Sequence, residues 1–131
     1  MSSKKEKTGK REFVVNVLGV PYKVYIGTAE DYPILKDNSS SGLCDFSIKA
    51  IWVVDTQLDK PEVGDLQNKK YLTDITLRHE LMHAYFHESG IEGYSENENL
   101  VNYLAMSLEK IYAMCEDAGA VKSLQAMRKA A

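Results

Sequence analysis

YLTDITLRHELMHAYFHES, residues 71–89, contains neither glycine nor proline and is followed directly by Gly90. An uninterrupted segment of this length favours an α-helix, and a glycine after the last turn is a common helix stop. On a helical projection, a polar stripe lies between two apolar flanks, which are Ile75, Met82 and Phe86 on one side and Leu77, Leu81 and Ala84 on the other. A narrow solvent-facing side remains for Asp74, Arg78 and Tyr85. The pattern therefore predicts a central, largely buried helix whose polar stripe faces a cleft.

The polar stripe consists of Thr76, His79, Glu80, His83 and His87. His79 and His83 are four residues apart, so their side chains lie one helical turn apart on the same face. Two neutral imidazoles in this arrangement can bind one zinc ion, and the glutamate between them can act on a water held by the metal. The alternative is a pair of surface histidines that flank a glutamate and bind no metal.

A catalytic zinc site needs three protein ligands and one open position, so a third ligand is required. His87 lies two turns beyond His79, about 12 Å along the helix axis, which is too far for one ion to bind both. It is expected instead to line the cleft or to act as a cation at the helix C-terminus. A second helix is expected over about 95–117, and it brings Glu96 and Glu98 in its first turn. Glu98 is the preferred third ligand, and Glu96 is the reserve.

Glu98 also has a possible structural role, because Ser95 and Glu98 have the spacing of a capping box with Ser95 as the N-cap. The ligand role is favoured because two histidines alone make a poor catalytic site. Asn102 follows Glu98 by four residues on the same face, where it is expected to orient a metal ligand by a hydrogen bond.

The first half of the chain has the pattern of a small sheet. Two β-branched and aromatic runs, 13–18 and 22–26, predict a hairpin around a Gly/Pro turn at 19–21. A loop is expected over 31–42, and a strand over 48–54 after a turn or bulge at 45–47. That strand is a candidate sheet edge beside the cleft, where an extended peptide could add by backbone hydrogen bonds. Trp52, within it, is expected in the core.

The predicted fold class is α+β, with a small antiparallel β-sheet packed on two or three helices. A polar connection is expected over 58–68 and a short third helix over 121–128. The chain of 131 residues is long enough for one domain, predicted over 11–131, after a disordered tail at 1–10. Cys44 and Cys115 are expected to be reduced and to act as small buried hydrophobes.

The net charge of −3 gives no electrostatic footprint for nucleic acid and no basic anchor for a membrane surface. No apolar run approaches the length of a bilayer span, and the Ser/Lys/Glu-rich start has no apolar core of the kind found in secretory signals. The expected location is therefore cytoplasmic. The sequence does not predict an oligomeric state.

Three segments carry a resemblance to a known family: LRHELMHA at 77–84, ESG at 88–90 and ENLV at 98–101. Together they are similar to small metallopeptidases encoded by phages and mobile elements, which resemble the ImmA/IrrE repressor-cleaving peptidases. A His-Glu-x-x-His motif followed by an acidic helix also resembles the gluzincin zinc peptidases. The similarity covers about residues 42–112. Gluzincins carry a Glu-x-x-x-Asp arrangement, from which Glu98 and Asn102 depart because an amide replaces the carboxylate.

The resemblance implies a minimal zincin-like domain with zinc as cofactor and a protein or peptide as substrate. The metal ligands would be His79, His83 and Glu98. Glu80 would be the general base, taking a proton from the metal-bound water and passing it to the leaving nitrogen. For the developing oxyanion the sequence does not choose among Tyr85, Tyr94, Tyr103 and His87. The alternative functions are a non-catalytic zinc-binding interaction module of phage or mobile-element origin and, more weakly, a structural helix without metal.

Overall fold

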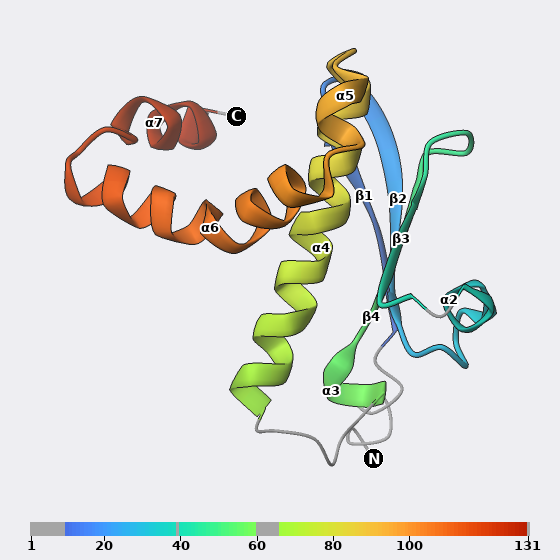
Figure 1. Cartoon of the computed structure of the whole chain (residues 1–131). Coiled ribbons are helices and arrows are strands. Elements are labelled where there is room, and N and C mark those ends of the chain that lie inside the picture. The colour runs from blue at the N-terminus through green and yellow to red at the C-terminus, as the bar shows by residue number, and fades with distance from the viewer. Residues whose placement is uncertain (1–9, 39, 60–65, 131) are drawn as a thin grey trace.

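The computed structural model describes residues 10–38, 40–59 and 66–130. A four-stranded sheet has the order β1-β2-β4-β3, and one long helix, α4, covers one of its faces (Figure 1). The strands are β1 (Arg11–Val17), β2 (Val20–Gly27), β3 (Gly42–Asp45) and β4 (Ala50–Val54). The helices are α2 (Pro33–Asp37), α3 (Thr56–Asp59), α4 (Leu66–Glu88), α5 (Glu92–Ser95), α6 (Glu98–Asp117) and α7 (Lys122–Ala130). The predicted α+β fold is confirmed, whereas the tail expected at 1–10 lies almost entirely outside the described residues.

The predicted hairpin is present as β1 and β2, but its turn is at Leu18 and Gly19. These residues have φ angles of 52° and 91°, which is the backbone of the two-residue turns that suit twisted strands. The side chain of Asn16 accepts a hydrogen bond of 2.6 Å from the backbone N–H of Gly19. Pro21, predicted in the turn, lies in β2 opposite Asn16.

The expectation of a purely antiparallel sheet is wrong, because β4 runs parallel to β2. After β2 the chain passes through α2, forms β3 at the edge of the sheet, and returns as β4 between β2 and β3. The strand predicted at 48–54 is therefore an internal strand, and the two edges of the sheet are β1 and β3. A continuous apolar run such as 51–54 is typical of a strand buried on both sides.

Two predicted connections also differ from the structure. The loop expected over 31–42 contains α2, which begins with Pro33, a favoured first residue because its missing N–H has no helical partner. The polar connection expected over 58–68 overlaps the end of α3 and the start of α4. Residues 60–65, between these helices, lie outside the described residues. The short third helix is confirmed as α7.

The core forms between the inner face of the sheet and α4. Its fully buried side chains come from alternate positions of the strands and from one helix position: Tyr22, Val24, Ile26, Ile51, Val53 and Ala84. Leu77 and Leu81 of the predicted apolar flank pack against this cluster. Trp52 points to the opposite face, where it is half-buried and stacks on Tyr25 at 5.6 Å, so its predicted place in the core is wrong.

Arg78 does not face solvent as predicted. Its Nε donates a hydrogen bond of 2.8 Å to the backbone carbonyl of Ala105, because α6 crosses α4 at this level. Val101 and Ala105 of α6 are fully buried at the crossing. Both cysteines are free as expected, but each is half-buried and not buried. Among the described residues, none of the helices has the length and apolar character that spanning a bilayer requires.

The C-terminal end of α4 is fixed to the sheet by a polar cluster around Glu88. Tyr22 Oη and Lys49 Nζ each donate a hydrogen bond of 2.6 Å to the same carboxylate oxygen, Glu88 Oε2. The bond from Lys49 and then the bond from Tyr22 lower the pKa of Glu88. This cluster joins β2, the turn before β4, and the helix that carries both histidines.

The lowered pKa of Glu88 makes the stability of the protein depend on pH. Above the usual glutamate pKa of about 4.3, Glu88 is ionised in the folded and unfolded chains, and its stabilising contribution is fully present. As the pH falls through the lower pKa of the folded state, that contribution is lost. We expect Glu88→Gln to lower the free energy of unfolding at pH 7, and the difference from the wild type to shrink below about pH 4.

Urea unfolding of both proteins between pH 3 and 7 measures this difference. Glu12→Gln, at an exposed position of β1, is the control and should follow the wild type at every pH. A difference between Glu88→Gln and the wild type that stays constant down to pH 3 would contradict the assignment.

Candidate metal centre

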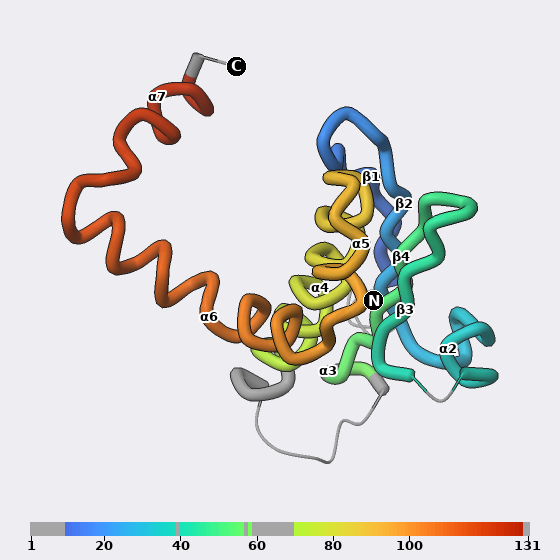
Figure 2. The backbone as a smooth tube through the Cα atoms, turned by 45° about the horizontal axis from the view of Figure 1, so that its top comes forward, coloured from blue at the N-terminus to red at the C-terminus, as the bar shows by residue number. Residues whose placement is uncertain are grey.

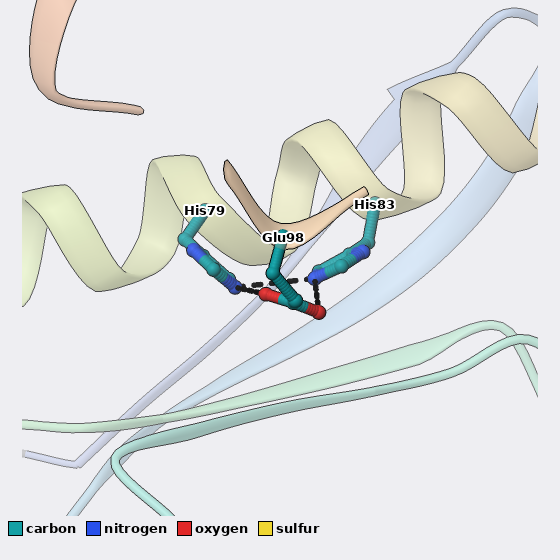
Figure 3. Close-up of side chains that lie close together, drawn as sticks. All are labelled: His79, His83 and Glu98. Carbon is teal, nitrogen blue, oxygen red and sulfur yellow. Dashed lines mark hydrogen bonds and ion pairs between the residues drawn. The ribbon is translucent and has the colours of Figure 1, made fainter. Parts of the chain in front are cut away.

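The two histidines of the motif lie on consecutive turns of α4 and point to the same side (Figure 3). Their Nε2 atoms are 3.1 Å apart. Both rings are largely shielded from solvent, as predicted for a stripe that faces a cleft. Burial, and then the neighbouring His83, lower the pKa of His79. A lowered pKa favours the neutral imidazole, which is the form that binds metal ions.

The third side chain, Glu98, is placed beside the histidines by a short connection between α4 and α6. Gly90 ends α4 with a φ of 79°, α5 follows at once, and Asn97 caps α6 by accepting a hydrogen bond of 3.0 Å from the N–H of Leu100. The alternative role of Glu98 in a capping box with Ser95 is therefore wrong. Glu98 is the first residue of α6, and from this position its side chain points towards α4.

Glu98 lies between the two histidines (Figure 3). Its Oε1 is 3.1 Å from His79 Nε2, and its Oε2 is 3.2 Å from His83 Nε2. Ligand atoms at about 2.1 Å from a tetrahedral zinc lie about 3.4 Å from one another. The three candidate ligand atoms all lie within 4.8 Å of one another, so the group has the dimensions to hold one metal ion.

Each histidine also has a hydrogen-bond partner behind it. His83 Nδ1 lies 2.7 Å from the backbone oxygen of Ser95, which fixes this nitrogen as the N–H and leaves Nε2 with its lone pair directed at Glu98. Ser95 Oγ donates a hydrogen bond of 3.1 Å to the carbonyl of His83. The side chain of Asn102 lies near His79 and acts to raise the pKa of this histidine, against the larger lowering by burial.

Glu80 lies beside this group and points into the interior of the groove. Its side chain is only 7% exposed, and burial, followed by the charge of Glu98, raises its pKa to about 7. A Cβ at Gly42 of β3 would lie 2.9 Å from Glu80 Oε2 and 2.7 Å from Thr76 Cγ2. The edge strand can therefore approach Glu80 this closely only because residue 42 has no side chain.

Two pockets meet at Gly42, His79 and Glu80 and follow β3 in both directions. The larger, of about 580 Å³, continues along Leu43, Cys44 and Phe46, and its opposite wall is formed by Glu92, Ser95 and Glu96. The smaller, of about 440 Å³, continues along Ser40 and Ser41 and reaches Asn102. The candidate metal group thus lies at the middle of a groove that runs along the edge strand.

The remaining candidates lie elsewhere. His87 stacks on the ring of Phe46 at 4.0 Å and pairs with Glu92 through Nδ1 at 2.6 Å, so it stands apart from the metal group as expected. Glu96 lines the larger pocket but does not join the group. Tyr85, Tyr94 and Tyr103 are exposed and line neither pocket. Burial raises the pKa of the Cys44 thiol to about 12, so this wall residue offers no thiolate.

Sequence reasoning missed two residues that shape the site. Ser95 was assigned to a helix cap, and its actual contact with His83 depends on α5, a four-residue helix without a clear sequence signal. Gly42 was placed in a loop, and its contact with Glu80 depends on which strand forms the edge. A serine five residues after a helix-ending glycine and a glycine at the start of a strand are both too common to be identified by pattern alone.

The geometry makes a specific prediction about metal binding. Purified protein is expected to hold close to one zinc ion per chain, measured by elemental analysis after dialysis. His79→Ala and Glu98→Gln should each lower the metal content strongly and remove the increase in melting temperature that zinc gives, because a ligand bound only to the folded state stabilises it. Glu96→Gln and His87→Ala are the matched controls and should retain the metal. Retention in Glu98→Gln with loss in Glu96→Gln would make Glu96 the third ligand.

Comparisons of the chain with protein-family models, with curated proteins and with solved structures find no match.

Proposed function

We propose that the protein is a zinc-dependent metallopeptidase in which His79, His83 and Glu98 hold the metal and Glu80 is the general base. The observation that carries the proposal is the convergence of three ligand atoms, within 4.8 Å of one another, beside a buried glutamate in a groove. A metal site with a purely structural role does not require a buried carboxylate with its own access to the groove. The histidine spacing, the helix register and the close approach of β3 all contribute to this arrangement.

In the proposed hydrolysis, the metal ion and the side chains have different roles. Zinc, when bound, supplies Lewis-acid polarisation of the scissile carbonyl and makes a water acidic near neutral pH. Glu80 takes the proton of the attacking water and passes it to the leaving nitrogen. Ser95 and Asn102 hold the imidazoles of His83 and His79 in the orientation that metal binding needs. The two rings therefore need little reorientation during the reaction.

An extended peptide is the substrate class that best fits the groove. β3 is an edge strand, and no other strand of the described residues pairs with its outer side, which an added strand could therefore use. The two pockets follow this strand on both sides of Glu80, which would place a peptide bond over the metal group with residues on either side. The peptide-binding edge, expected at 48–54 from the sequence, is thus reassigned to β3.

The proposal includes the resemblance to gluzincins and to the small phage-borne and ImmA/IrrE-like peptidases. The ligand set and the acidic second helix agree with that resemblance. Asn102 departs from it, because an amide oxygen accepts a hydrogen bond from histidine but carries no charge. We expect this exchange to affect the rate more than the binding of metal. A cytoplasmic location belongs to the proposal as well.

Glu80→Gln tests the function directly. We expect cleavage of a mixed peptide library, followed by mass spectrometry, to fall by a factor of about 10²–10⁴, because a general base typically contributes this much. The variant should retain zinc, since Glu80 is not a ligand. Glu12→Gln, which lies on an exposed face of β1, is the control and should cleave like the wild type.

The other outcomes separate the alternatives. A zinc-loaded wild type that cleaves no peptide, but binds peptides in a way that requires His79, would favour the non-catalytic interaction module. Cleavage by Glu80→Gln at the wild-type rate would exclude Glu80 as the base. A protein that binds no zinc would overturn the proposal as a whole.

A further inference from the structure

The last part of the chain extends away from the sheet and α4. After crossing α4, α6 continues outward, and α7 follows at its far end after a turn at Gly119 (Figures 1 and 2). We call residues 108–130 the arm. The arm comprises the outer half of α6 and all of α7. Among the described residues, no ion pair joins α6 to α7. Several large apolar side chains of the arm are exposed to solvent, namely Ile111, Tyr112, Met114, Leu124 and Met127.

The apolar face of the arm continues a packed interface. Val101 and Ala105 are fully buried against α4, and the same face of α6 continues beyond the crossing as Leu108, Tyr112 and Cys115. Tyr112 is 42% exposed, and Ile111 beside it is 39% exposed. The spacing of this face, at intervals of three and four residues, is that of helices that pack along their length. In the outer half of the stripe Leu108 and Cys115 are half-buried and Tyr112 is exposed, which is less burial than at Val101 and Ala105.

The two helices of the arm differ in net charge. Within the arm, α6 carries Glu109, Lys110, Glu116 and Asp117, with the acidic pair at its end, whereas α7 carries Lys122, Arg128 and Lys129 and no acidic residue. A partner surface of a single charge sign would be complementary to only one of these two helices. A second copy of the same arm, related by a two-fold axis, matches both, because the acidic end of each α6 then faces the basic α7 of the other copy.

We propose that the arm is a dimerisation element, and that two copies of the chain pair arm to arm through the apolar stripe of α6. The contact is isologous, with the acidic end of α6 from each protomer against α7 of its partner. The apolar stripe supplies most of the affinity, and the charges select the antiparallel arrangement. This inference does not depend on the peptidase proposal, since none of its residues belongs to the candidate metal centre.

The first experiment measures the oligomeric state by sedimentation equilibrium. We expect a dimer for the wild type, and a dissociation constant at least about tenfold higher for Tyr112→Glu, because a charge would have to be buried in the interface. Tyr103→Glu is a matched control. Tyr103 is an exposed tyrosine on the same helix, nine residues earlier and about 180° around the axis, so the same substitution there should leave the dimer intact.

The second experiment tests whether the charges pair between protomers. A first variant, Glu116→Lys with Asp117→Lys, makes both arm helices basic. A second variant, Arg128→Glu with Lys129→Glu, makes the arm predominantly acidic. Each variant alone should dimerise more weakly than the wild type at low salt. A mixture of the two should form a heterodimer, because every α6–α7 contact between unlike copies is again between opposite charges.

The results that overturn the proposal are specific. A monomeric wild type at all accessible concentrations rejects it, whether the arm is free or folded onto its own chain. A dimer that is equally sensitive to Tyr103→Glu and Tyr112→Glu, or insensitive to both, places the interface elsewhere. Two charge variants that do not associate when mixed reject the antiparallel arrangement of the arms. Circular dichroism and metal content of each variant establish that the body of the protein remains folded.

Discussion

The packing of α4 against the inner face of the sheet is the constraint on which the rest of the structure depends. Ala84, Leu77 and Leu81 turn one side of the helix towards the strands, and the helical repeat then directs His79 and His83 to the adjacent side. Gly42 allows β3 to lie directly against Glu80, so this carboxylate is buried where the edge strand is closest. A rotation of α4 by one residue, about 100°, would separate the histidines from Glu98 and expose Glu80.

The connection between α4 and α6 matters as much as the helices it joins. Only a few residues separate Gly90 from Glu98, and within them α5 places the carbonyl of Ser95 against His83. The short connection thus serves two purposes, because it orients one imidazole and also returns the chain in time for Glu98 to reach both. Metal sites of this kind need the ligands and also the groups that hold them in place.

The features predicted correctly from the sequence are those with a strong local period or a fixed spacing. The central helix and the hairpin follow from periods within one segment, and the grouping of Glu98 with His79 and His83 follows from the histidine spacing together with a short connection to a second helix. Sheet order was not predicted, because the apolar run at 51–54 fits an edge and an internal strand equally well until its neighbours are known. The Ser95 cap failed for a related reason, since Asn97 competes for the same role two residues later. Arg78 was misplaced because its partner, the carbonyl of Ala105, is 27 residues away.

α6 links the candidate metal centre and the arm in one rigid element. Glu98, at the first turn, is 62% exposed on its side chain, whereas the two histidines are 20% and 13% exposed, so its position depends less on its own packing than on the placement of the helix that carries it. That placement is set at the crossing, by buried Val101 and Ala105 and by the hydrogen bond from Arg78. The same uninterrupted helix carries Glu98 at its first turn and continues beyond the crossing into the arm. Glu98 and the apolar stripe lie on neighbouring faces of this helix, so one element carries a candidate metal ligand and an interhelical packing surface together.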